Sequence, residues 1–178
     1  MDYQKYSKEV YGLEVRKGRW DGSPEKEIRN LEEVQAHGIA ELSEAVGALM
    51  KGRFSPDVSI LKIDDPAFKD TFESNYKDTF EDEMADSWLV FMVGLGRLNY
   101  ELNNYDVPSL TVEPVPFVGY AAFTATQRGM AAPNRITSKV YWVGCAKLIE
   151  ELARRKGIDL EAHIKLKMRY NELREMKY

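Results

Sequence analysis

Hydrophobic residues recur at helical spacing along much of this chain, and the pattern predicts four helices. Ser23 with Pro24 is typical of a helix start, and Gly52 is typical of a helix stop. Gly157 predicts a further stop, and Asp159 directly after it predicts a new N-cap. We therefore expect helices over residues 24–50, 79–103, 137–156 and 160–175.

The helix predicted over residues 79–103 has the most unusual pattern. Its stretch from Trp88 to Gly96 carries no charge on any side, which is typical of a helix buried on most faces. We expect it at the centre of a bundle or at an oligomer interface. The first predicted helix has small residues where a surface helix usually has charged ones, which predicts a second element packed closely there. These small residues are Ala36, Ala40, Ser43 and Gly47.

The remaining segments show no clear helical period. Residues 1–22 and the connector 52–78 are irregular, and residues 104–137 form an irregular, proline-containing insertion. The sequence therefore predicts a single all-α domain over residues 1–178, a four-helix-type bundle with one insertion. Because several helices are apolar on more than one side, we expect a homodimer or tetramer.

The composition is that of an ordinary globular protein. Hydrophobic residues make up 44% and charged residues 30%, which argues against disorder. The net charge of −4 does not favour nucleic acid as a partner. Cys145 is the single cysteine, and no apolar run approaches the ~20 residues of a membrane helix. We expect a soluble, cytoplasmic protein with no membrane partner.

Two pairs of acidic residues are candidates for metal binding. Glu41 and Glu44 are three residues apart, so they are neighbours on a helix. Two adjacent carboxylates repel each other unless a cation lies between them, and oxygen ligands favour Mg²⁺ or Mn²⁺. A solvated acidic face is the plainer interpretation of this pair.

Glu83 and Asp86 repeat the spacing of three at the start of the most apolar helix. Compensation of the helix dipole explains acids in a first turn, but it explains Asp86 poorly because this residue lies one turn further in. An unpaired carboxylate is costly to bury there, and metal coordination would remove that cost. The second pair is therefore also interpreted as a set of metal ligands.

A polar stripe near the C-terminus is a candidate for phosphate binding. Lys167, Asn171 and Arg174 follow the spacing i, i+4, i+7 and share one helix face. A lysine, an amide and a guanidinium can together hold phosphate oxygens. The alternative is a basic helix end favoured by the dipole.

In this order, the three features resemble the MazG-like all-alpha nucleoside-triphosphate pyrophosphohydrolases, a family related to dimeric dUTPases. The family pattern has a glutamate pair on one helix, E-x-x-D on the next and K-M-x-Y-N-x-x-R near the end. The matching segments here are Ala40–Ala45, Glu83–Asp86 and Lys167–Arg174. The chain departs from the pattern at Ala40, where the family often has a glutamate, and by the insertion 104–137.

The resemblance implies cleavage of a nucleoside triphosphate between the α and β phosphorus atoms, giving a monophosphate and pyrophosphate. It implies Mg²⁺ as cofactor, with Mn²⁺ as an alternative, and Glu41 or Glu44 as the general base. The implied metal ligands are Glu41, Glu44, Glu83 and Asp86. The residues expected to bind substrate are Lys167, Asn171 and Arg174 at the phosphates, and Trp88 and Tyr170 at the base or ribose.

Three other classes of protein compete with this interpretation. A purely structural bundle is one of them, and Asp86 in its apolar helix argues against it. A di-iron bundle needs Glu-x-x-His motifs, and neither His37 nor His163 has a glutamate three residues before it. A catalytically inactive helical bundle that binds a nucleotide or a protein partner remains the alternative to the enzyme.

Overall fold

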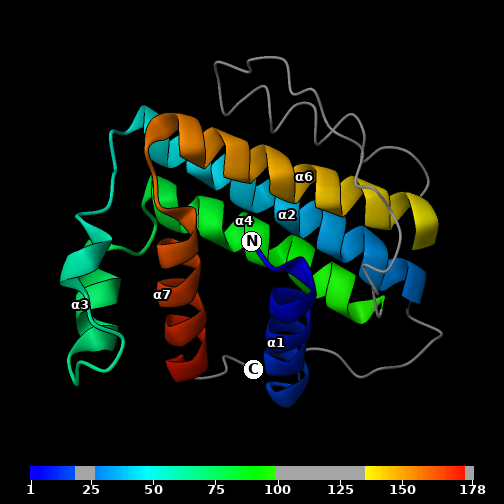
Figure 1. Ribbon diagram of the computed structural model, residues 1–178, viewed down its shortest axis with the longest axis horizontal. Helices are drawn as coiled ribbons and strands as arrows, with labels where there is room; N and C mark the ends of the chain where they lie inside the picture. The colour runs from blue at the N-terminus through cyan, green and yellow to red at the C-terminus, as the bar shows by residue number, and fades with distance from the viewer. Residues whose placement is uncertain (19–26, 99–134, 175–178) are drawn as a thin grey trace.

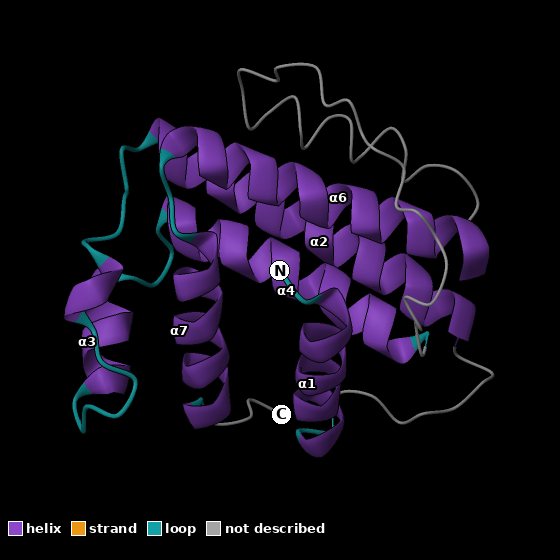
Figure 2. Cartoon of the chain, viewed as in Figure 1, coloured by secondary structure: helices purple, strands orange, loops and turns teal. Residues whose placement is uncertain are grey.

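The computed structural model describes residues 1–18, 27–98 and 135–174. Side chains are described for residues 1–18, 32–98 and 141–174. These ranges are helical and contain no strand (Figure 2). The elements are α1 (Tyr3–Arg16), α2 (Glu27–Met50), the short 3-10 helix η2 (Val58–Ile60), α3 (Phe68–Asn75), α4 (Phe80–Arg97), α6 (Arg135–Lys156) and α7 (Leu160–Leu173) (Figure 1). The prediction of an all-α fold is confirmed.

Helix α4 is the centre of the fold. It packs against α1, α2, α6 and α7, whereas α3 packs against α7. In Figure 1, α2 runs in the opposite direction to α4, and α1 and α7 lie across the long helices. The apolar run predicted to be central is buried, with Trp88, Phe91, Met92 and Leu95 each 0% exposed. The acidic residues at the start of α4 are therefore fixed to the most buried helix of the described structure.

Most predicted helix ends agree with the structure where it describes them, but α4 ends at Arg97, before the predicted end at residue 103. The Thr79 hydroxyl accepts a hydrogen bond from the backbone N–H of Asp82 at the start of α4. The Asp159 carboxylate caps α7 in the same way. Gly52 and Gly157 have φ of 65° and 70°, a conformation that favours glycine after a helix. The predicted start at Ser23 lies outside the described residues, as does most of the insertion 104–137.

Two helices were not predicted. Helix α1 lies within residues 1–22, and α3 lies within the connector 52–78. Helix α1 buries a face that consists largely of tyrosine and polar residues, so its pattern is not plainly apolar. Phe68 and Phe72 of α3 form a second buried cluster with Tyr76 and Tyr170.

A close approach between α2 and α4 sets their relative position. A Cβ placed on Gly38 of α2 would lie 2.6 Å from the ring of Phe91 on α4, so only glycine fits without movement. The buried hydroxyl of Ser87 donates to the carbonyl of Gly38 at 2.9 Å, a second link between the same two helices. Both contacts lie within about one helical turn of Glu41 or Asp86 along the chain.

The small-residue face of α2 is not covered by the described part of the chain. Ala36, Ala40 and Ser43 are exposed, and a Cβ on Gly47 would have no described atom within 4 Å. The element expected to pack on this face is therefore not among the described residues. A search of the described helices finds none with the length and hydropathy needed to cross a membrane.

Candidate metal centre and adjoining pocket

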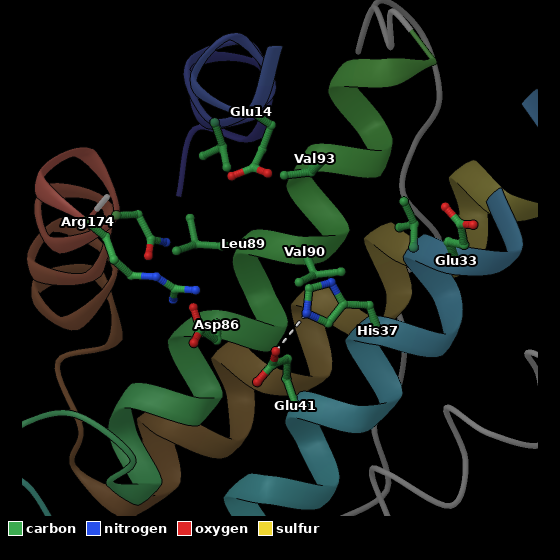
Figure 3. A pocket seen from close by; sticks show the side chains of 12 residues that line it. Glu14, Glu33, His37, Glu41, Asp86, Leu89, Val90, Val93 and Arg174 are labelled. Atoms are coloured by element: carbon green, nitrogen blue, oxygen red, sulfur yellow. Dashed lines mark ion pairs between the residues drawn. The ribbon is translucent and has the colours of Figure 1, made fainter. Parts of the chain in front are cut away.

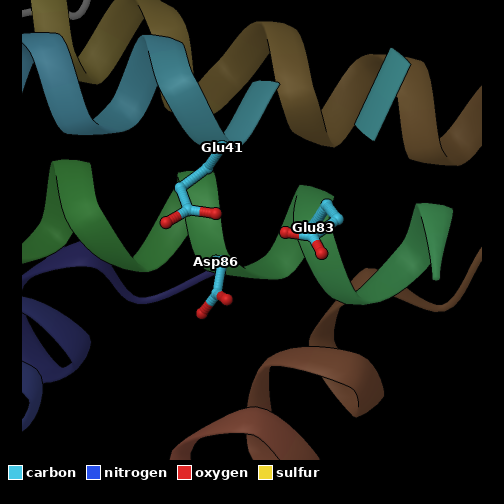
Figure 4. Close-up of side chains that lie close together, drawn as sticks. All are labelled: Glu41, Glu83 and Asp86. Atoms are coloured by element: carbon cyan, nitrogen blue, oxygen red, sulfur yellow. The ribbon is translucent and has the colours of Figure 1, made fainter. Parts of the chain in front are cut away.

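Three of the four predicted metal ligands come together between α2 and α4. Glu41 of α2 and Glu83 and Asp86 of α4 each present a carboxylate oxygen, and these oxygens lie within 4.8 Å of one another (Figure 4). The Glu83 side chain is buried, whereas the side chains of Glu41 and Asp86 are 15% and 22% exposed. We call these three residues the acidic triad. Its exposed edge gives small ions access from solvent.

Crowding and burial oppose ionisation of the triad. Burial, together with the neighbouring charges of Asp82 and Asp86, raises the pKa of Glu83 to about 9. Burial also raises the pKa of Asp86 to about 7, although the charge of Lys167 opposes this rise. Burial acts to raise the pKa of Glu41 as well, but the hydrogen bond and charge of His37 outweigh it, so this pKa lies below its usual value.

One lysine is buried beside the triad. The ammonium group of Lys167 lies 2.9 Å from an Asp82 oxygen and 2.5 Å from an Asp86 oxygen. The Lys167 and Asp82 side chains are 5% and 2% exposed. Burial would lower the pKa of Lys167, but the two aspartates raise it, so the lysine is held in its charged form.

Among the described residues, carboxyl groups outnumber the cations around the triad. Four carboxylates gather here, those of Asp82, Glu83, Asp86 and Glu41, against one buried ammonium group from Lys167. His37 adds an ion pair to Glu41 at 2.8 Å, but its side chain is 59% exposed. Carboxylate oxygens are the ligands that Mg²⁺ and Mn²⁺ favour, so this donor set fits a divalent cation, whose charge would favour the ionised form of each carboxyl group.

A pocket opens on the side of the triad where Glu41 and Asp86 lie (Figure 3). Its volume is about 340 Å³, the size of a small-molecule site. Its floor is apolar, and polar side chains from α1, α2, α4 and the C-terminal end of α7 surround that floor. The apolar lining residues are Val10, Val34, Leu89, Val90 and Val93, and the polar ones are Glu14, Glu33, His37, Glu41, Asp86, Asn171 and Arg174.

Glu44 lies on the other side of the triad. It is exposed, one turn beyond Glu41, and it lines a separate hollow together with Glu83. It does not belong to the group of oxygens within 4.8 Å. The first predicted pair is therefore divided, with Glu41 at the pocket and Glu44 at the hollow.

The predicted C-terminal stripe is divided as well. Asn171 and Arg174 line the pocket, and Figure 3 shows the Arg174 side chain extending toward Asp86. The Lys167 ammonium group forms ion pairs with Asp82 and Asp86 instead of facing the pocket. The expectation that Lys167 contacts phosphate directly is therefore corrected: in this structure it is the counter-ion of two aspartates.

Two predicted substrate contacts are core residues instead. Trp88 is 0% exposed, and its indole N–H donates to Glu150 at 3.0 Å. Tyr170 is 3% exposed, its ring stacks on Phe72 at 4.6 Å, and its hydroxyl donates to Glu73. Neither aromatic face is available to a base or ribose, because each ring is already enclosed by protein.

Helix α1 forms one wall of the pocket. The Lys17 ammonium group donates to the backbone carbonyls of Asn171 and Arg174, the latter at 2.8 Å. This contact satisfies carbonyls at the end of α7 that have no partner within the helix. It also brings Val10 and Glu14 of α1 to the wall of the pocket.

Two residues of the site had no role in the sequence-based prediction. Asp82 was interpreted as dipole compensation, yet it is one of the two partners of Lys167. Its spacing of four from Asp86 puts both carboxylates on one helix face, which is the signal that could have identified it. His37 precedes Glu41 by four residues, and the same rule predicts their ion pair.

Comparison with protein-family models, with characterised proteins and with solved structures found no significant match.

Proposed function

We propose that this chain is a Mg²⁺-dependent nucleoside-triphosphate pyrophosphohydrolase. The observation that carries the proposal is the acidic triad: two acidic pairs with a spacing of three lie on neighbouring helices that run in opposite directions, and three of their side chains converge. A purely structural bundle has no need to gather these carboxylates on its central helix, because burying them is costly.

The proposed metal ligands are Glu41, Glu83 and Asp86, with Glu44 close enough along α2 to join through its own side chain or a water molecule. When bound there, Mg²⁺ would neutralise phosphate charge and lower the pKa of a coordinated water. Mn²⁺ has the same preference for oxygen ligands. Lys167 would hold Asp86 in place and limit the negative charge that the cation must offset.

The reaction consumes one water molecule. Its oxygen forms a bond to the α-phosphorus, the bond from that phosphorus to the α–β bridging oxygen breaks, and pyrophosphate leaves with this oxygen. The released proton needs a base. Glu41, on the pocket side of the triad, and Glu44, on the side of the separate hollow, are the two candidates for this base.

The test is pyrophosphate release from a panel of canonical and modified ribo- and deoxyribonucleoside triphosphates with Mg²⁺. We expect equal amounts of monophosphate and pyrophosphate from at least one nucleotide, and no release after chelation of the metal. A folded protein that binds Mg²⁺ but cleaves no nucleotide would contradict the proposal and favour the non-catalytic bundle.

We also propose that the chain is a homodimer or tetramer that covers the small-residue face of α2. Ser43 is exposed on this face, and its hydroxyl donates to the carbonyl four residues earlier. Ser43→Arg should shift the assembly toward monomer in light scattering, because a long charged side chain prevents close helix contact. Ser74→Arg is the matched control, since Ser74 is exposed and makes the same type of hydrogen bond on α3. A monomeric wild-type protein would refute the assembly.

A further inference from the structure

A second hollow lies on the side of the triad away from the pocket. Its volume is about 450 Å³. It is bordered by small residues of α2 and by charged side chains of both signs. The lining residues are Glu44, Gly47, Ala48, Lys51, Arg53, Asp78 and Glu83. We call it the basic hollow after Lys51 and Arg53, which lie beside a triad ligand although Glu44, Asp78 and Glu83 line it as well.

The local backbone fixes the two cations at this place. Helix α2 ends at Gly52, whose positive φ of 65° turns the chain. The N–H of Arg53 then donates to the carbonyl of Ala48, and the carbonyl of Arg53 accepts from the N–H of Phe80, each at 2.9 Å. The residues after α2 are thereby joined to the start of α4, one turn before Glu83.

The side chains remain able to reach a ligand. Arg53 lies 3.9 Å from Asp78, at the outer limit of an ion pair, and its side chain is 49% exposed. Asp78 has a closer cation in Lys77, at 2.5 Å. Lys51 is exposed. A phosphate can therefore draw Lys51 and Arg53 inward without leaving Asp78 unpaired.

The pocket and the hollow differ in polarity, and the triad lies between them. Among its described lining residues, the pocket has an apolar floor and one side chain that is always cationic, that of Arg174. The described lining of the hollow has two cations, three acids and no large apolar side chain. An uncharged ring system suits the first, and a chain of phosphates suits the second.

From this arrangement we propose that Lys51 and Arg53 bind the β- and γ-phosphates, so that the phosphate chain crosses the triad from the pocket into the basic hollow. The inference rests on the proposed function and adds the orientation in which the nucleoside triphosphate lies across the triad. The nucleoside end lies over Leu89, Val90 and Val93, the α-phosphate lies at the triad, and the departing pyrophosphate lies in the basic hollow. Lys167 takes no part in phosphate binding.

The test is calorimetric binding of inorganic pyrophosphate and of a nucleoside monophosphate, each with Mg²⁺, to the full chain. Lys51→Gln/Arg53→Gln should weaken pyrophosphate binding about tenfold or more and leave monophosphate binding unchanged, because two charge-assisted contacts are lost at one end only. Lys62→Gln/Arg154→Gln is the control, since it removes the same two charges from exposed positions elsewhere. Far-UV circular dichroism checks that each variant is folded.

Three results would overturn the inference: no pyrophosphate binding by the wild-type protein, unchanged pyrophosphate binding by the Lys51/Arg53 variant, or an equal loss for both ligands. A loss of pyrophosphate binding in Arg174→Gln, with Lys51→Gln/Arg53→Gln unaffected, would put the outer phosphates in the pocket instead. Binding of pyrophosphate is measured without turnover. An inactive wild-type protein would therefore contradict the proposed function and still leave this measurement decisive for the hollow.

Discussion

Asp86→Asn should remove Mg²⁺-dependent turnover, with kcat/KM falling on the order of 100-fold or more, while the fold remains intact. Asparagine keeps the size of the side chain but loses the negative charge that a cation would bind. The fold should survive because Lys167 keeps Asp82 as a partner at 2.9 Å. Removing one charge also relieves the repulsion that raises the pKa of Glu83. Steady-state kinetics and thermal unfolding measure the two effects separately.

The control for this variant is Asp70→Asn. Asp70 is an exposed acid in the first turn of α3, so the substitution makes the same chemical change away from the triad. It should leave both kinetics and unfolding unchanged. Near-normal turnover in Asp86→Asn would show that Asp86 is not a metal ligand in the reaction.

Lys167→Met should lower the free energy of unfolding by about 3–5 kcal/mol, because it leaves the buried Asp82 and the partly buried Asp86 without their cation. Methionine replaces most of the apolar stem, so packing changes little. Urea unfolding at neutral pH measures the loss. The matched control is Lys165→Met on the same helix, since Lys165 pairs with Glu161 at 2.9 Å with both side chains about half exposed, and it should change stability little.

A second substitution separates charge from packing at this position. Adding Asp82→Asn to Lys167→Met should restore part of the lost stability, because one of the two unpaired carboxylates is removed. If Lys167 mattered through packing alone, the double variant would be at least as unstable as Lys167→Met. That outcome would refute its role as a counter-ion.

Long apolar helices were predictable because their pattern repeats many times. The uncharged run of α4 identified the central helix, and the N-cap at Asp159 marked the start of α7. Helix α1 was not predicted because its buried face includes Tyr3, Tyr6 and Ser7, and neither tyrosine nor serine marks a buried position clearly. Helix α3 has only 8 residues, too few for a period to emerge.

Spacing along one helix predicted neighbours, but not which neighbours would meet across helices. It paired Glu41 with Glu44 and Glu83 with Asp86, and the rotation of α2 against α4 then brought Glu41, not Glu44, into the triad. Lys167, Asn171 and Arg174 share a face of α7, yet Lys167 lies opposite α4 acids and the other two reach the pocket. Whether a cation faces solvent or a buried carboxylate depends on tertiary packing, which no single-helix pattern contains.

The excess of carboxylates on the central helix has a consequence for the lifetime of the protein in a cell. Burying these carboxyl groups close together makes the metal-free chain less stable than its packing alone would allow, as the raised pKa of Glu83 indicates. Any cation that binds the folded chain and not the unfolded one restores that stability in proportion to the logarithm of its concentration. The fraction of chains with a cation at the triad would then determine resistance to proteases as well as activity. Metal-free chains would be degraded sooner than metal-bound ones.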